Sequence, residues 1–166
     1  MKIGKVYSTE YRNLIVSAEA DGTMPSPFNG IVRPCWKMTL TRIDNPALTT
    51  SIRVNPNGCY SYPARRALLM TLMILCCRAF DALRGEARYK RKKLYYTMGQ
   101  SDKGYEYCAA VRDSLREVMG DMNEVAKLKM ALHEDAPNTP WEDEPEDEPE
   151  DEPATPDTDI HAPAHD

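Results

Sequence analysis

The most apolar stretch of the chain is ALLMTLMILCC, Ala67 to Cys77, in which only Thr71 is polar. Arginines flank this stretch on both sides, at Arg65, Arg66 and Arg78. The stretch is far shorter than the roughly 20 residues that span a bilayer. Pro63 suits the first turn of a helix, and apolar residues cover too much of the circumference for a surface stripe. The sequence therefore predicts a helix over residues 63–83 that is buried on most sides in a soluble domain.

The residues before this helix predict a β-sheet, because short β-branched or alternating segments are separated by Asn, Gly and Pro. The alternation is clearest after Pro34, where Trp36, Met38 and Leu40 share one side of a strand. Pro34 itself indicates an edge, a bulge or a lead-in to that strand. Asp21-Gly22 is expected to make a turn. The predicted strands lie within residues 1–60, at Lys2–Ser8, Asn13–Ala20, Ile31–Ile43 and Leu48–Val54.

Strands followed by helices are typical of an α+β fold, in which the apolar helix covers one face of a small antiparallel sheet of three or four strands. Residues 1–135 suit one such domain with a single core. A few strands and then a long helix is also the element order of a common architecture that binds single-stranded nucleic acid on the open face of a curved sheet. That comparison rests on element order alone, and no motif identifies a family.

A second, amphipathic helix is predicted over residues 105–133, after a turn at Gly99–Gly104. Its apolar residues alternate at spacings of three and four, which is nearly a heptad pattern. This seam consists of Cys108, Val111, Leu115, Val118, Met122, Val125 and Leu132. We expect the seam to pack against the first helix. Self-association of two chains is the alternative, which Gly120 and Lys129 weaken.

Basic and acidic residues are divided unevenly along the chain. Residues 1–135 contain all 21 basic residues and 14 acidic ones, a net charge of +7, whereas residues 136–166 contain 12 acids and no base. The acidic tail includes the run EDEPEDEPEDEP at 142–153, which predicts disorder because its charge is high and proline recurs at every fourth position. This asymmetry favours a polyanionic partner or a tail that shields the basic body.

The sequence offers little that could support catalysis. His133 is the only histidine before the tail, and no phosphate-binding glycine motif occurs. Glu19 and Asp21 could share a strand face and hold a divalent ion, but a strand end followed by a turn explains them better. The five cysteines have no metal-binding spacing, and Cys76 and Cys77 resemble core residues in a reducing cytoplasm more than a redox switch. We therefore expect a protein without catalytic activity, metal or cofactor.

The strongest functional signal is RGEARYKRKKLYY, residues 84–96, which is expected to follow a helix end or kink at Gly85. Its basic residues outnumber its single acid, Glu86, by five, and tyrosines lie among them. Cations neutralise phosphates and aromatic rings stack on bases. The predicted nucleic-acid contacts are Arg84, Arg88, Tyr89, Lys90, Arg91, Lys92, Lys93, Tyr95 and Tyr96. A solvated basic surface with tyrosines packed beneath it is the equally simple alternative.

The strand region adds weaker support for the same function. Four cations, Arg33, Lys37, Arg42 and Arg53, lie in or beside the predicted strands, with only Asp44 close by in the sequence. Trp36 could stack on a base if the sheet face is open. A tryptophan in a strand is more often part of the core, and we expect this first.

These observations predict a small cytoplasmic protein that binds nucleic acid, with single strands favoured over duplexes. Its acidic tail would compete for the basic surface, recruit a protein partner, or only keep the body soluble. The alternative is an interaction or inhibitor protein that uses the heptad helix and a tail that imitates DNA. Small size, missing catalytic motifs and the tail suggest a phage or another mobile element. No membrane contact is expected, and homo-oligomers remain open.

Overall fold

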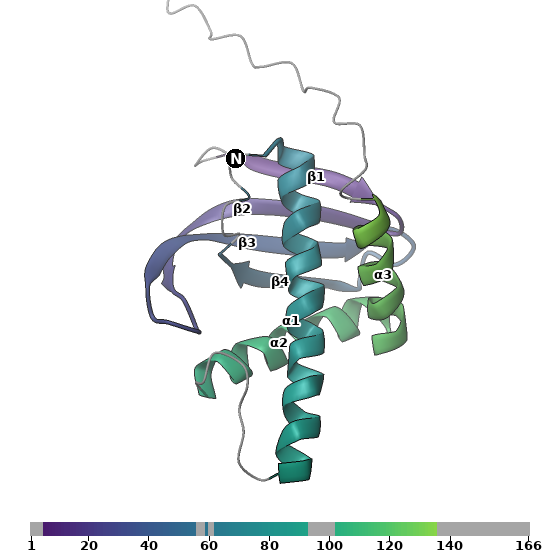
Figure 1. Cartoon of the computed structure of the whole chain (residues 1–166). Helices are drawn as coiled ribbons and strands as arrows, with labels where there is room; N and C mark the ends of the chain where they lie inside the picture. Colours follow the sequence, from purple (N-terminus) through teal and green to yellow (C-terminus); the bar gives the residue numbers. More distant parts are fainter. Residues whose placement is uncertain (1–4, 56–58, 60–61, 93–101, 136–166) are drawn as a thin grey trace, which may run out of the picture.

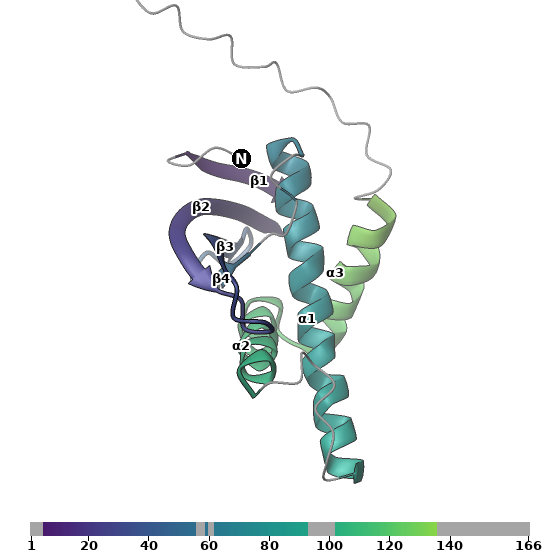
Figure 2. The ribbon, with the colours of Figure 1, turned by 60° about the vertical axis from the view of Figure 1, so that its left-hand side comes forward.

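The structure is a computed structural model, and it describes residues 5–55, 59, 62–92 and 102–135. Four antiparallel strands form one sheet in the order of the sequence: β1 (Val6–Tyr11), β2 (Leu14–Pro25), β3 (Val32–Arg42) and β4 (Thr49–Val54). Three helices follow: α1 (Ala64–Lys92), α2 (Asp102–Met119) and α3 (Met122–Asp135). The helices lie on one side of the curved sheet, with α1 running across the strands between α2 and α3 (Figures 1 and 2). The predicted α+β fold is confirmed.

The core lies between the inner face of the sheet and α1. The alternation predicted for β3 is confirmed, because Trp36, Met38 and Leu40 are all buried there. They pack with alternate residues of β2 and β4 and with one broad side of α1. Thr71 is the polar residue of the buried stretch, and its hydroxyl donates to the carbonyl oxygen of Ala67 at 2.7 Å. No helix in the described part of the chain is long and apolar enough to cross a membrane.

The first strand lies later in the chain than predicted, at Val6–Tyr11 instead of Lys2–Ser8. Tyr11 pairs with Leu14 across the β1–β2 turn, in which Arg12 has a φ of 53°. The C-terminal end of α3 closes on this turn. The hydroxyl of Tyr11 donates to Asp135 at 2.8 Å, and the guanidinium of Arg12 lies 3.3 Å from the same carboxylate. These contacts hold Asp135, the last residue of the described fold, against the sheet.

Asp21-Gly22 does not make the predicted turn. Strand β2 continues through it to Pro25, with a register shift against β3 between Ala20 and Thr23. Gly22 adopts a φ of 70°, which glycine accepts without the cost that a side chain would add. Such a bulge increases the local twist and bends the strand. The β2–β3 hairpin therefore bends toward α2, as Figure 2 shows.

Helix α1 runs through Gly85 to Lys92, so the predicted end at residue 83 is wrong. One glycine in a helix costs only about 1 kcal/mol relative to alanine, and the residues that follow are mostly good helix formers. Contacts with α2 also hold this part of the helix. Glu86 accepts a hydrogen bond from the hydroxyl of Tyr105 at 3.0 Å and pairs with Arg112.

The predicted helix over residues 105–133 is two helices, because α2 ends at Met119 and α3 begins at Met122. Gly120 leaves the helical conformation with a φ of 97°. Asp121 then caps α3, since its carboxylate accepts from the backbone N–H groups of Asn123 and Glu124 at 2.8 and 2.9 Å. The break turns the heptad seam into two short buried stripes.

Candidate nucleic-acid interface

Trp36 is part of the core and presents no ring face to solvent. Its side chain is 3% exposed and lies 6.3 Å from the ring of Tyr7, measured between centroids. Tyr7, Tyr11 and Trp36 are the aromatic residues of the four strands, and the register places all three on the inner face. The structure therefore offers no aromatic stacking platform on the open face of the strands, and the core interpretation of Trp36 holds.

The basic residues predicted to contact nucleic acid from the strands are already paired with acids. Lys37 lies 3.6 Å from Glu19, and Arg53 lies 2.7 Å from Asp21. These acids are distant in sequence, and the pairing of β2 with β3 and of β3 with β4 brings them beside the cations.

Arg42 pairs with Asp44 in the β3–β4 loop, as their closeness in sequence suggested, with 2.7 Å between Nε and the carboxylate. This contact and a hydrogen bond from the side chain of Asn13 lower the pKa of Asp44 to about 2. The paired carboxylate of Asp44 is thus ionised at neutral pH.

Small hydroxyl side chains cover the middle of the outer sheet face. Cross-strand pairing places Ser17, Thr39 and Ser51 in one row, and the hydroxyls of Thr39 and Ser51 are 2.9 Å apart. Thr41 and Thr49 form a similar contact at 2.8 Å. With its cations paired and its hydroxyls bonded to one another, this face lacks the excess positive charge that phosphate binding requires.

The basic segment has a different arrangement, because its first nine residues are the end of α1. We call residues 84–92 the basic end. Its single acid, Glu86, is turned toward α2, where Arg112 and Tyr105 bind it. The Arg112 side chain is only 14% exposed, so this contact is largely inside the protein. Glu86 is therefore held at the contact between α1 and α2.

Helical geometry places several basic positions of this end on one side of α1. Successive residues turn by about 100°, so positions 84, 88, 91 and 92 fall within about a quarter to a third of the circumference. The C-terminal end of α1 extends beyond α2 and away from the sheet (Figures 1 and 2). The structure describes the backbone of Arg88, Tyr89, Lys90, Arg91 and Lys92 but not their side chains, and Lys93, Tyr95 and Tyr96 lie outside the described residues.

A shallow depression at the start of the basic end joins α1 to α3. Phe80, Leu83, Arg84 and Lys129 line it, so that two cations border an apolar floor without a carboxylate. Arg84 is 67% exposed and pairs with Asp81 at 2.7 Å. The Nζ atom of Lys129 lies 5.3 Å from the ring centroid of Phe80. Sequence reasoning did not include Lys129 in the site, although a lysine on a heptad seam is a sign that the position reaches the surface.

The heptad seam faces the interior of the fold. Val111, Leu115 and Val118 of α2 and Val125 and Leu132 of α3 belong to the same core as the sheet and α1. Cys108 is buried against Ala82 of α1, and Met122 is partly buried beside the core. These residues pack within the chain, as we expected first, and the described fold leaves no open seam for a second copy.

No group of three or more histidine, cysteine or acidic residues lies close enough to hold a metal ion within the described ranges. Burial raises the pKa of the Cys76 thiol to about 12 and that of Cys108 to about 11. The fraction of reactive thiolate at these two positions is therefore very small at neutral pH.

The acidic tail, residues 136–166, lies outside the described residues, so its predicted disorder is untested. In the described part of the chain, Arg84 and Lys129 thus lie together at the start of the basic end, whereas Lys37 and Arg53 on the sheet face are paired with acids. Comparisons of the chain with protein-family models, with curated proteins and with solved structures found no match.

Proposed function

We propose that this protein binds nucleic acid through the basic end of α1, without catalysis. The observation that carries the proposal is the continuation of α1 through Gly85. The continuous helix extends a row of basic positions beyond the domain, while Glu86 is occupied by Arg112 and Tyr105. Lys129 adds a cation from α3 beside Arg84.

The cations of such a surface would contact the phosphate backbone and not the bases. Lysine and arginine release counterions from the polyanion when they bind it, which gives affinity that depends on salt and little on sequence. The preference for single strands stays part of the proposal and rests on the tyrosines interleaved with the cations in residues 84–96. The acidic tail is proposed to compete with nucleic acid for the same cations.

The competing proposal was a protein that binds a partner through the heptad helix and the tail. Burial of the seam within the chain argues against the helical part of that proposal. The part of the competing proposal that is left is a tail that binds a protein partner. Truncation of the tail distinguishes this function from nucleic-acid binding.

The direct test is a binding titration with single-stranded and duplex DNA and RNA across a range of salt concentrations. The variant Arg91→Ala/Lys92→Ala removes two cations from the basic end. The matched control, Lys37→Ala/Arg53→Ala, removes two paired cations from the sheet face, so both variants have the same net charge. The measured quantity is the slope of the logarithm of the binding constant against the logarithm of the salt concentration. We expect the magnitude of this slope to fall by about 0.7–0.9 for each phosphate contact that the first variant removes and to change little in the control.

Equal losses of affinity in the two variants would mean that net charge alone drives binding, and a loss confined to the control would move the interface to the sheet. A chain that ends at Asp135 should bind more tightly than the full chain, most clearly at low salt. A tail of scrambled order and the same composition serves as the control and should inhibit as well as the natural one. Equal affinity of the truncated and full chains would rule out competition by the tail.

A further inference from the structure

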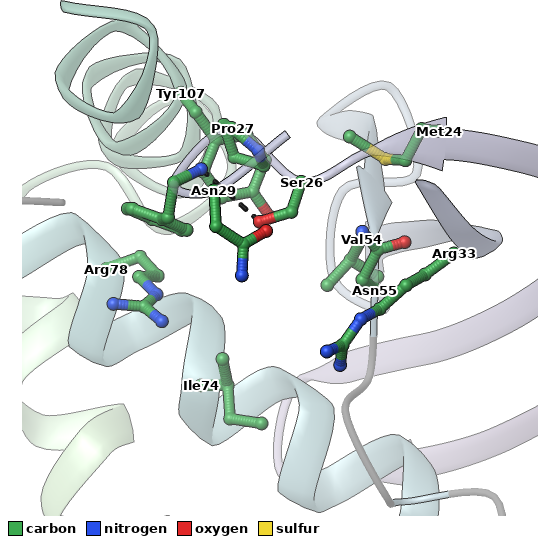
Figure 3. A pocket seen from close by; sticks show the side chains of 11 residues that line it. Met24, Ser26, Pro27, Asn29, Arg33, Val54, Asn55, Ile74, Arg78 and Tyr107 are labelled. Carbon is green, nitrogen blue, oxygen red and sulfur yellow. Dashed lines mark hydrogen bonds between the residues drawn. The ribbon is translucent and has the colours of Figure 1, made fainter. Parts of the chain in front are cut away.

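A small pocket lies between the β2–β3 hairpin, the end of β4 and the two helices α1 and α2. Its volume is about 100 Å³, enough for a few water molecules or one small polar group. Figure 3 shows Arg33 of β3 and Arg78 of α1 on opposite sides of the pocket, with Ser26 and Asn29 of the hairpin tip between them. The pocket is distinct from the basic end and from the outer face of the sheet.

The hairpin tip that forms one wall is held by its own hydrogen bonds and by the helices. The N–H of Gly30 donates to the carbonyl oxygen of Ser26 at 2.8 Å, and the N–H of Ile31 donates to the side chain of Asn29 at 3.1 Å. Phe28 packs edge-on against Tyr107 at 6.0 Å between ring centroids. The guanidinium of Arg78 lies 4.4 Å from the Phe28 ring centroid. The wall is therefore preorganised, and a ligand need not order it.

The residues that line the pocket include two arginines and no carboxylate. Arg78 is only partly neutralised, because its contact with Asp81 is 3.4 Å long and Asp81 also pairs with Arg84 at 2.7 Å. Asp81 is not among the lining residues. Two guanidinium groups facing one small space create a positive potential, which favours an anion with several acceptor oxygens.

Two of the neutral residues of the pocket, Asn55 and Tyr107, add an acceptor and a donor. The side-chain oxygen of Asn55 is buried and has no hydrogen-bond partner among the described residues, a state that costs free energy unless a donor fills it. Burial raises the pKa of Tyr107 to about 12, so its hydroxyl keeps its proton at neutral pH and remains a donor. A ligand that satisfies this set must accept from the cations and also donate to Asn55.

A phosphomonoester meets these requirements. It has three terminal oxygens and up to two negative charges, and its second pKa of about 6 leaves it partly protonated near neutral pH. In the monoanion, the protonated oxygen can donate to Asn55 while the other oxygens accept from the guanidinium groups. A phosphodiester within a strand has no such proton and extends on both sides, which a pocket of this size does not accommodate.

We propose that the pocket formed by Arg33, Arg78 and Asn55 binds a phosphomonoester group. The group could belong to a small phosphate ester or to the phosphorylated end of a nucleic-acid strand, and the second source rests on the proposed function. In that case strand ends would bind the pocket while the phosphodiester backbone contacts the basic end.

The experiment uses the full chain and two measurements. The first is the melting temperature in inorganic phosphate, with sulfate at equal ionic strength as the comparison. The second is the affinity for one single-stranded oligonucleotide with either a 5′-phosphate or a 5′-hydroxyl, and with a 3′-phosphate as a further arm. Arg33→Gln is the test variant, because Arg33 is exposed and its loss should not unfold the domain. Arg53→Gln, which removes an exposed arginine from the outer sheet face, is the matched control.

We expect phosphate to raise the melting temperature more than sulfate does, and Arg33→Gln to weaken apparent phosphate binding about tenfold while Arg53→Gln leaves it unchanged. A preference of at least tenfold for a phosphorylated strand end, lost in Arg33→Gln, identifies the strand as the ligand. Stabilisation by phosphate without that preference identifies a small phosphate ester. If phosphate stabilises the protein but no oligonucleotide binds, the phosphomonoester proposal stands and the proposed nucleic-acid binding is wrong. If oligonucleotides bind equally well with and without a terminal phosphate, and inorganic phosphate has no specific effect, the phosphomonoester proposal is wrong. Nucleic-acid binding by the protein would still stand.

Discussion

The two halves of α1 share a backbone conformation and almost nothing else. In the buried half, residues 67–79, leucines and small residues pack against the sheet and the other helices, with Leu68, Leu72 and Leu75 fully buried. The basic end, residues 84–92, carries five cations and one acid and extends beyond the domain. Helical conformation follows from local hydrogen bonds and propensity, whereas burial follows from what packs against the helix. A change of composition along a helix therefore does not indicate where the helix ends.

The largest difference between the halves should appear in stability. Leu72→Ala removes a fully buried side chain and should lower the free energy of unfolding by about 2–5 kcal/mol. Arg84→Ala, in the exposed part of the basic end, should change it by no more than about 0.5 kcal/mol. Urea denaturation followed by circular dichroism measures both values. Similar decreases in the two variants would show that the basic end is part of the core.

A smaller effect is expected at the junction between the halves. Gly85→Pro removes a helical hydrogen bond and places a ring against the preceding turn, at a cost of up to about 3 kcal/mol. Because the core lies before this position, we expect a weaker helical signal after residue 85 and weaker nucleic-acid binding, with the domain still folded. Gly85→Ala, which favours the helix, is the comparison. An unchanged circular dichroism spectrum in the proline variant would contradict a helix that continues to Lys92.

The contact between Glu86 of the basic end and α2 should have a smaller effect on the free energy of unfolding than Leu72→Ala or Gly85→Pro. Glu86→Gln keeps the shape of the side chain and removes the charge that faces Arg112. Removing a charge-assisted hydrogen bond of this kind should cost about 1.5 kcal/mol in the free energy of unfolding. The same denaturation measurement checks it, with Glu106→Gln on the exposed side of α2 as the control. No difference between the two variants would mean that Glu86 is not bound by α2 in solution.

The smallest effect lies within the buried half and concerns two neighbouring thiols. Cys76 is fully buried and burial raises its pKa to about 12, whereas Cys77 is only partly buried. A thiol reagent at neutral pH should modify Cys77 first and should reach Cys76 only when the domain opens. Mass spectrometry of the digested protein locates each label. Equal labelling rates in the folded protein would place Cys76 at the surface and revive a redox role for the pair.

The parts of the fold that could be predicted from the sequence are those set by local periodicity. Alternation alone identified Trp36, Met38 and Leu40 as one face of a strand, and their burial confirms it. The partners of Lys37 and Arg53 could not be predicted, because Glu19 and Asp21 reach them only through the strand register. The positive charge predicted for the open face is therefore neutralised by residues that are distant in sequence.

Two glycines illustrate the limits of helix prediction. Gly85 was expected to interrupt a helix and does not, whereas Gly120 was read only as a weak point in a seam and ends one. The difference lies in the next residue. Asp121 is able to cap a new helix, while Glu86 continues the old one and is held by α2. A glycine followed by a capping residue is a stronger signal of a boundary than a glycine alone.

The contact of Asp135 with Tyr11 and Arg12 determines where the acidic tail is tethered. Whatever conformation the tail adopts, covalent geometry limits each residue to about 3.6 Å of reach. Glu142 can therefore lie no more than about 25 Å from the tether point, and each four-residue repeat extends the limit by about 14 Å. The basic end lies at the far end of α1, which is about 43 Å long over its 29 residues. The number of repeats thus sets how far from Asp135 the acids can reach. Only the later acids of the run are far enough along the chain to reach the last cations of α1.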